Sequence, residues 1–305
     1  MMRRLLVLLS LLVLAAVQPA HSAPLKLGVL PAADTIVLHV AADEGLFAKQ
    51  GLEVELVPFQ SALELGAAMR AGALSGHFGD IINVLMQNES GSPQAIVATT
   101  SHSSPDNRCF GLVVSPKSKA QTLADLKGKD IAVSSATIID FLLAQLLLQE
   151  GAAPDFLNRQ DILQMLLSGQ IESALLPEPL VSLVEAKGAR TILNDCKLNT
   201  PLAVIALKRD VLDAPDGAQT VAKFREALRE AAKRINETPD AYRPIMEAKG
   251  LLPKGASANY TMVRFDMTHT PTGLPSEADI KTFADWMKAN RILKKDPAYG
   301  DVVFQ

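Results

Sequence analysis

The sequence predicts an α/β fold of two lobes, each a mostly parallel sheet flanked by helices, with a cleft between the lobes. One observation is a repeated segment: residues 75–82 and 168–179 each begin with Ser-Gly after a helix pattern and run as a short strand to an acidic residue. A second observation is that an apolar strand, a small-residue loop, an apolar helix and a glycine follow one another at residues 27–45 and again at 131–151. Alternating strands and helices favour parallel sheets, which bind ligands beyond the carboxyl ends of their strands. The cleft is therefore the predicted binding site.

Residues 1–23 have the layout of a secretory signal peptide. Arg3 and Arg4 precede an apolar run over residues 5–17, and the small residues Ala20, Ser22 and Ala23 follow it. The run is too short to cross a bilayer, and the alternative is a buried N-terminal helix. We expect export, with cleavage after Ser22 or Ala23, and no membrane insertion of the mature chain.

Lobe 1 is predicted to span residues 24–108. We expect strands at 25–30, 53–57, 78–80 and 95–100. Between them we expect a helix at 36–44 with Asp34 or Thr35 as its N-cap, a helix opened by the capping box Ser61/Glu64 and closed by Gly72, and a helix at 81–88. The polar loop 101–107 is the first candidate crossing between the lobes.

Lobe 2 is predicted to span residues 109–203. We expect strands at 109–114, 130–133 and 190–193, a one-turn helix capped by Thr122 and Asp125, and helices at 138–149, 161–167 and 180–186. A strand at 200–207 should return to lobe 1. Residues 204–305 then add helices opened by Asp216/Gln219, Thr238-Pro239 and Ser276/Asp279. The single Trp, Trp286, lies on the last of these helices, and we expect it to pack or to lie half exposed rather than to bind ligand.

The candidate ligand contacts are polar residues on cleft-side loops or helix starts: Asp34, Thr35, Asp80, Ser101, Ser135, Thr137 and Glu178. The helix at 138–149 follows three hydroxyl residues, and its first N–H groups would point into the cleft. Simple helix capping remains an alternative for Asp34 and for the hydroxyl residues. Among these loops we find carboxylates and no Arg or Lys.

Cys109 and Cys196 are the two cysteines of the chain. In an exported protein a disulfide between them is the leading interpretation, and two buried thiols are the alternative. Neither cysteine belongs to a zinc-binding spacing, so we predict no metal site.

The five His residues are scattered along the chain, and no catalytic or cofactor-binding motif occurs, which favours a binding protein without a cofactor over an enzyme. The net charge of −3, or −5 without Arg3 and Arg4, gives no reason to expect nucleic acid as a partner.

Three segments carry a resemblance to a known family: residues 41–55 (AADEGLFAKQGLEVE), residues 126–133 (LKGKDIAV) and residues 168–174 (SGQIESA). The chain resembles the type II periplasmic solute-binding proteins of ABC importers, in the branch that handles nitrate, alkanesulfonates, taurine and thiamine-pyrimidine precursors. The resemblance implies a two-lobed protein that closes on a small ligand and then docks on a membrane permease. We expect the mature protein to be a monomer in the periplasm and its ligand to be polar.

The residues in the predicted cleft differ from those of anion-binding members of that family, which tend to use hydroxyl and basic groups. A buried carboxylate facing an anion is costly, so we expect a neutral or cationic polar heterocycle rather than nitrate or a sulfonate. Two alternatives stay open. One is an exported enzyme on the same scaffold, with Asp80 or Glu178 as acid or base. The other is a sensing subunit for a membrane receptor.

Overall fold

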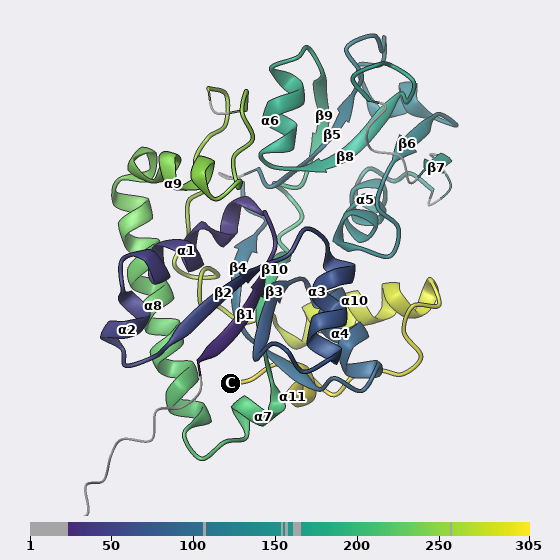
Figure 1. Cartoon of the computed structure of the whole chain (residues 1–305). Helices are drawn as coiled ribbons and strands as arrows, with labels where there is room; N and C mark the ends of the chain where they lie inside the picture. Colours follow the sequence, from purple (N-terminus) through teal and green to yellow (C-terminus); the bar gives the residue numbers. More distant parts are fainter. Residues whose placement is uncertain (1–23, 106–107, 154, 156–157, 161–165, 257) are drawn as a thin grey trace, which may run out of the picture.

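Two five-stranded sheets organise the part of the chain that the computed structural model describes, namely residues 24–105, 108–153, 155, 158–160, 166–256 and 258–305 (Figure 1). The predicted signal peptide and residues 161–165 of the predicted helix at 161–167 lie outside this range. The first sheet has the order β2-β1-β3-β10-β4 and the second the order β7-β6-β8-β5-β9. The predicted fold of two α/β lobes is confirmed.

Each sheet contains one strand that runs against the others, and that strand comes directly after a crossing between the lobes. In the first sheet β10 is antiparallel to β3 and β4, and in the second β5 is antiparallel to β8 and β9. The strands are β1 (Leu25–Val29), β2 (Val54–Pro58), β3 (Gly76–Gly79), β4 (Gln94–His102), β5 (Phe110–Val114), β6 (Asp130–Ala132), β7 (Asn158–Gln160), β8 (Ser173–Pro177), β9 (Arg190–Asn194) and β10 (Pro201–Lys208). The two sheets therefore share one design, as the repeated segments predict.

The predicted boundary between residues 203 and 204 falls inside β10, which belongs to the first sheet along its whole length.

Helices surround both sheets. They are η1 (Ala33–Thr35), α1 (Ile36–Asp43), α2 (Leu46–Lys49), α3 (Ala62–Arg70), α4 (Ile81–Glu89), η2 (Leu123–Leu126), α5 (Ile138–Gln149), α6 (Leu180–Glu185), α7 (Arg209–Leu212), α8 (Gly217–Glu237), η4 (Pro239–Tyr242), α9 (Arg243–Ala248), α10 (Glu277–Ala289) and α11 (Tyr299–Val302).

Several helix starts follow the predicted capping chemistry. The Ser61 hydroxyl accepts a hydrogen bond from the Glu64 backbone N–H, and Thr122 with Asp125 and Ser276 with Asp279 form reciprocal capping boxes. The predicted box at Asp216 is wrong. The Asp216 backbone is not extended (φ −103°, ψ 7°), and its carboxylate makes no capping hydrogen bond.

The glycine of the first repeated segment has a different role from the one predicted. Gly72, with a φ of +74°, ends α3, whereas Gly76 is already the first residue of β3. A Cβ on Gly76 would lie 2.3 Å from the Ala206 carbonyl oxygen of β10, so this position needs glycine for close strand packing. In the second segment Gly169 does adopt the left-handed conformation, with a φ of +74°.

The buried face of α8 covers one side of the first sheet, together with α1 and α2 (Figure 1). Its apolar residues recur at helical spacing, as in Val221, Phe224 and Leu228, and Phe224 stacks on Phe47 with ring centroids 5.2 Å apart. The other side of this sheet packs against α4 and α10.

Helix α10 contacts both lobes. It packs against α4 beside the first sheet, and its Phe283 stacks on Phe141 of α5 in the second lobe, with ring centroids 4.0 Å apart. Trp286 forms a T-shaped pair with the same Phe141 ring, with ring centroids 5.6 Å apart. The predicted packing role of Trp286 is confirmed, and one apolar cluster continues from one lobe into the other through α10.

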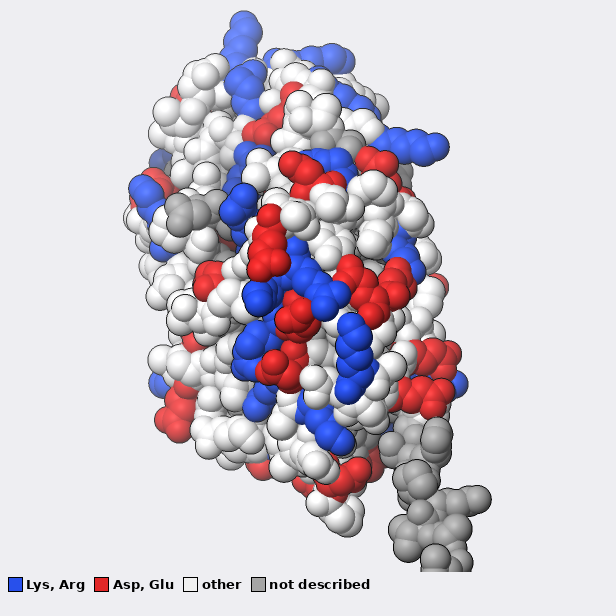
Figure 2. Space-filling view, turned by 90° about the vertical axis from the view of Figure 1, so that its left-hand side faces the viewer, with Lys and Arg blue, Asp and Glu red and all other residues white. Residues whose placement is uncertain are grey.

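Positive and negative side chains lie next to one another on the face shown in Figure 2, without a large area of one sign. Ion pairs of the chain include Arg234 with Glu44 and Arg229 with Glu226. Within the described residues, no helix combines the length and apolar character needed to cross a membrane.

Candidate functional site

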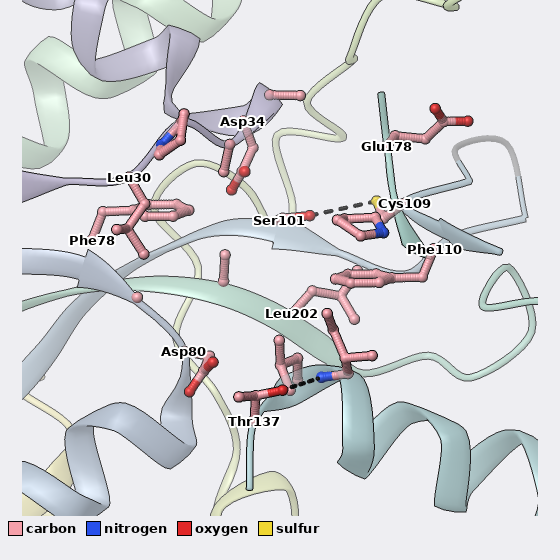
Figure 3. A pocket seen from close by; sticks show the side chains of 18 of the residues that line it. Leu30, Asp34, Phe78, Asp80, Ser101, Cys109, Phe110, Thr137, Glu178 and Leu202 are labelled. Atoms are coloured by element: carbon pink, nitrogen blue, oxygen red, sulfur yellow. Dashed lines mark hydrogen bonds between the residues drawn. The ribbon is translucent and has the colours of Figure 1, made fainter. Parts of the chain in front are cut away.

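A cavity of about 280 Å³ lies where the two lobes meet (Figure 3). Lobe 1 lines it through the loop after β1, the end of β3 and the start of α4, and lobe 2 through the start of β5, the start of α5 and the end of β8. These are the carboxyl ends of the parallel strands and the two crossings, where an α/β fold places its ligands. The volume is near the lower limit for small-molecule pockets, which is about 300 Å³.

Of the candidate ligand contacts, the structure places Asp34, Asp80, Ser101, Thr137 and Glu178 around this cavity. It does not bring Thr35 or Ser135 there. Thr35 is buried beside the cavity, and its hydroxyl donates to the Ala32 carbonyl oxygen at 2.6 Å. Ser135 is exposed, and its neighbours Ser134 and Thr137 line the cavity instead.

Asp34 does not cap the helix after it. It lies in η1, and its Oδ2 accepts a hydrogen bond of 2.6 Å from the Thr100 hydroxyl of β4. The capping alternative for Asp34 is therefore wrong. Thr35 does hold the N-cap position of α1, but its side chain makes no capping hydrogen bond. Burial raises the pKa of Asp34 from its ordinary value of 3.8 to about 6, although the bond from Thr100 opposes this shift.

We expect the Asp34→Asn variant without ligand to be more stable than the original protein at pH 7.5, by roughly 2–3 kcal/mol. Because the raised pKa of Asp34 makes the folded state bind the proton more tightly than the unfolded state, the stability contributed by this group is lost as pH rises from about 4 to about 6. Urea unfolding of both proteins at pH 4 and pH 7.5 measures the effect. The expectation would be contradicted if the two proteins differed in free energy of unfolding by the same amount at pH 4 and at pH 7.5.

Asp80 and Thr137 combine helix capping with a place in the cavity wall. Asp80 Oδ1 accepts from the Asn83 backbone N–H at 2.8 Å at the start of α4, and the Thr137 hydroxyl accepts from the Ile139 backbone N–H at 3.2 Å at the start of α5. Burial raises the pKa of Asp80, while hydrogen bonds from Asn83 and from the backbone of Ile138 in the other lobe lower it. Asp80 and Thr137 therefore cap helices and also line the cavity.

Arg108 is a cavity residue that the sequence did not suggest, and the expectation of no basic side chain there is wrong. Its guanidinium donates to Glu178 through Nε and Nη2, to Glu185 through Nη1 and Nη2, and to Thr191 through Nη1, at 2.5–3.3 Å. The other Glu178 oxygen accepts from the Ser182 backbone N–H at 3.1 Å. Glu178 is therefore an anchor for Arg108 and for the start of α6.

Most of the cavity wall is apolar, which the sequence also did not indicate. The apolar and aromatic residues include Leu30, Phe78, Phe110, Ile138, Leu202 and Tyr260. In Figure 3 the Phe78 and Phe110 rings extend from opposite lobes, with Leu202 between them, and Asp34 and Asp80 lie on opposite sides of the space.

The predicted disulfide is not formed: the structure has Cys109 and Cys196 as thiols. Cys109 lines the cavity, and its Sγ accepts a hydrogen bond from the Ser101 hydroxyl at 3.4 Å. Burial, together with the carboxylate of Asp195, raises the pKa of the Cys109 thiol, so the nucleophilic thiolate is disfavoured. Within the described residues, no group of three His, Cys, Asp or Glu side chains is arranged to hold a metal ion.

The family model described as "NMT1/THI5 like" matches residues 32–242, which is more than half of the chain. The chain belongs to the NMT1/THI5-like family. This family match agrees with the predicted resemblance to the nitrate, sulfonate and taurine branch of the solute-binding proteins.

Solved structures with the same fold lie at low sequence identity to this NMT1/THI5-like protein. The alkanesulfonate-binding protein SsuA from Xanthomonas axonopodis pv. citri, bound to MOPS, is 20% identical, with 93% of this chain and 98% of that chain covered and a TM-score of 0.74. The periplasmic aliphatic sulphonate-binding protein SsuA from Escherichia coli is 17% identical, with 93% of this chain and 92% of that chain covered and a TM-score of 0.76. A Cys-to-Ser mutant of DszB in complex with biphenyl-2-sulfinic acid is 15% identical, with 92% of this chain and 96% of that chain covered and a TM-score of 0.64. A search of curated protein sequences finds no match.

Proposed function

We propose that this protein is the solute-binding component of an ABC importer. It would be exported to the periplasm with removal of its signal peptide, capture a small organic solute between its lobes and deliver that solute to a membrane permease. The observation that carries the proposal is the cavity between the lobes, lined from both sides by residues at the carboxyl ends of strands. The family match and the solved binding proteins of the same fold support it.

The chemistry of the cavity favours binding over catalysis. Asp80 and Glu178, the candidate acid and base of the enzyme alternative, each use their oxygens for helix starts or for Arg108. The Cys109 thiol has a raised pKa. A ligand that contacts both lobes would instead stabilise the closed arrangement through its higher affinity for that state.

Mass spectrometry of the small molecules released when the purified protein is denatured tests the proposal. We expect a bound solute that leaves unchanged, and loss of uptake of that solute when the gene is deleted. Conversion of the solute during incubation with the protein would favour the enzyme alternative. Uptake that continues without the protein would contradict the role in import.

Asp80→Ala and Thr137→Ala are each expected to weaken binding of the identified solute by about 1–3 kcal/mol, because each removes a polar group from the cavity wall. Calorimetric titration measures the affinities. Ser135→Ala is the matched control, since Ser135 lies in the same loop as Thr137 but does not line the cavity, and its affinity should not change. Equal affinity in all three variants would leave Asp80 and Thr137 with helix capping alone.

A further inference from the structure

The cavity has walls suited to a compact ring. Phe78 of β3 and Phe110 of β5 contribute aromatic faces from the two lobes, and Leu202 of β10 lies between them (Figure 3). Moving an apolar or aromatic ring of a ligand from water to such a surface lowers the free energy of the complex. The polar groups of the ligand must then find partners among the few polar side chains that remain.

The cationic side chain in the described part of the wall, Arg108, is fully engaged by the protein. A guanidinium has five N–H donors, and hydrogen bonds to Glu178, Glu185 and Thr191 account for all of them. Two carboxylates face this one guanidinium, so the cluster carries an excess of negative charge. An anionic ligand would have to displace a carboxylate to reach Arg108.

Two further carboxyl groups line the cavity without a cationic partner. The side chain of Asp34 receives its hydrogen bond from the neutral Thr100 hydroxyl, and that of Asp80 from the neutral Asn83 amide groups. These residues are only 9% and 8% exposed. A buried carboxylate needs a compensating positive charge, and the ligand is the component of the closed site that can supply it.

We infer that the solute is a small organic cation with an apolar ring, such as an aromatic amine or amidine, whose N–H groups face Asp34 and Asp80. The inference rests on the proposed solute-binding function and specifies its ligand class. It implies that this cavity rejects sulfonates, even though structures of the same fold include sulfonate-binding proteins.

Calorimetric titration with three probes that share one ring tests the charge selection. We expect benzamidine, a cation, to bind at least about tenfold more tightly than neutral benzyl alcohol, because its hydrogen bonds to a carboxylate are charge-assisted. Benzenesulfonate should give no binding at the same concentrations. Benzenesulfonate binding as tightly as benzamidine, or no binding of benzamidine at millimolar concentration, would overturn the inference.

Variants locate the selection within the site. Asp34→Asn keeps the shape and an acceptor for Thr100 but removes the charge, so benzamidine should lose about tenfold in affinity while benzyl alcohol is unaffected. Asp43→Asn is the matched control, because Asp43 pairs with Lys249 on the surface and does not line the cavity. An unchanged ratio of benzamidine to benzyl alcohol affinity in Asp34→Asn would count against the assigned contact.

Glu185→Gln gives a second measurement on a residue outside the cavity wall. It removes one of the two carboxylates facing Arg108, so benzamidine binding should weaken and benzenesulfonate binding should become detectable. Continued rejection of benzenesulfonate by a folded Glu185→Gln protein would show that the Arg108 cluster does not set the selection.

The natural solute separates this inference from the proposed function. If the molecule released on denaturation is an anion whose uptake depends on this protein, the ligand class is wrong and the binding function stands. If the protein selects benzamidine but no solute uptake depends on it, the ligand class stands and the import function is wrong.

Discussion

Phe283→Ala is expected to lower the free energy of unfolding by about 3–5 kcal/mol. Phe283 is fully buried in α10 and stacks on Phe141 of α5, so the truncation removes a large side chain and leaves a cavity at the junction of the lobes. Chemical denaturation measures the change. Leu63→Ala, at a position that is 79% exposed, should stay within about 0.5 kcal/mol of the original protein. A loss below about 1 kcal/mol for Phe283→Ala would mean that the two lobes do not depend on this contact.

Arg108→Ala is expected to lower the free energy of unfolding by about 3–4 kcal/mol, because it leaves Glu178 and Glu185 facing each other without the guanidinium. The side chains of these glutamates are 10% and 29% exposed, so water compensates only in part. Arg108→Lys should be intermediate, since an ammonium group keeps the charge but cannot reproduce the forked pattern of donors.

The control for Arg108 is Arg229→Ala, which removes an ion pair with Glu226 between side chains that are about half exposed. We expect that change to stay within about 1 kcal/mol. Similar losses for Arg108→Ala and Arg229→Ala would show that the Arg108 cluster is no stronger than an ordinary surface pair.

The fold could be predicted because its signals are local. Apolar strands, capping residues such as Ser276 with Asp279, and a repeated order of elements act over a few residues each, and the structure keeps them. The prediction failed at Asp216 and Gly76, where neighbouring backbone decides the outcome. The Asp216 backbone is not extended, and Gly76 lies against the carbonyl of Ala206, which is distant in the sequence.

The carboxyl groups of the site could be predicted because they follow strands, and strand ends of parallel sheets meet at one edge. Asp80 and Glu178 illustrate this rule. Ser135 illustrates its limit, because a loop of hydroxyl residues does not reveal which of them turns inward.

The apolar wall and Arg108 could not be predicted from local patterns. Phe78 and Phe110 lie in strands, where an aromatic residue facing a cavity looks the same in the sequence as one facing the core. The partners of Arg108 are 70 to 83 residues away along the chain, so nothing near Arg108 in the sequence reveals that its charge is already compensated.

The position of Trp286 supplies an optical probe of the molecule. Trp286 is the single tryptophan of the chain, and it belongs to a helix that packs on lobe 1 while its ring forms a T-shaped pair with Phe141 in lobe 2. Indole fluorescence depends on the polarity and contacts of the ring, and no other tryptophan contributes to the signal. A rotation of one lobe against the other would therefore change the emission of the unlabelled protein, so rapid mixing with solute would test whether the proposed closure occurs and how fast it is.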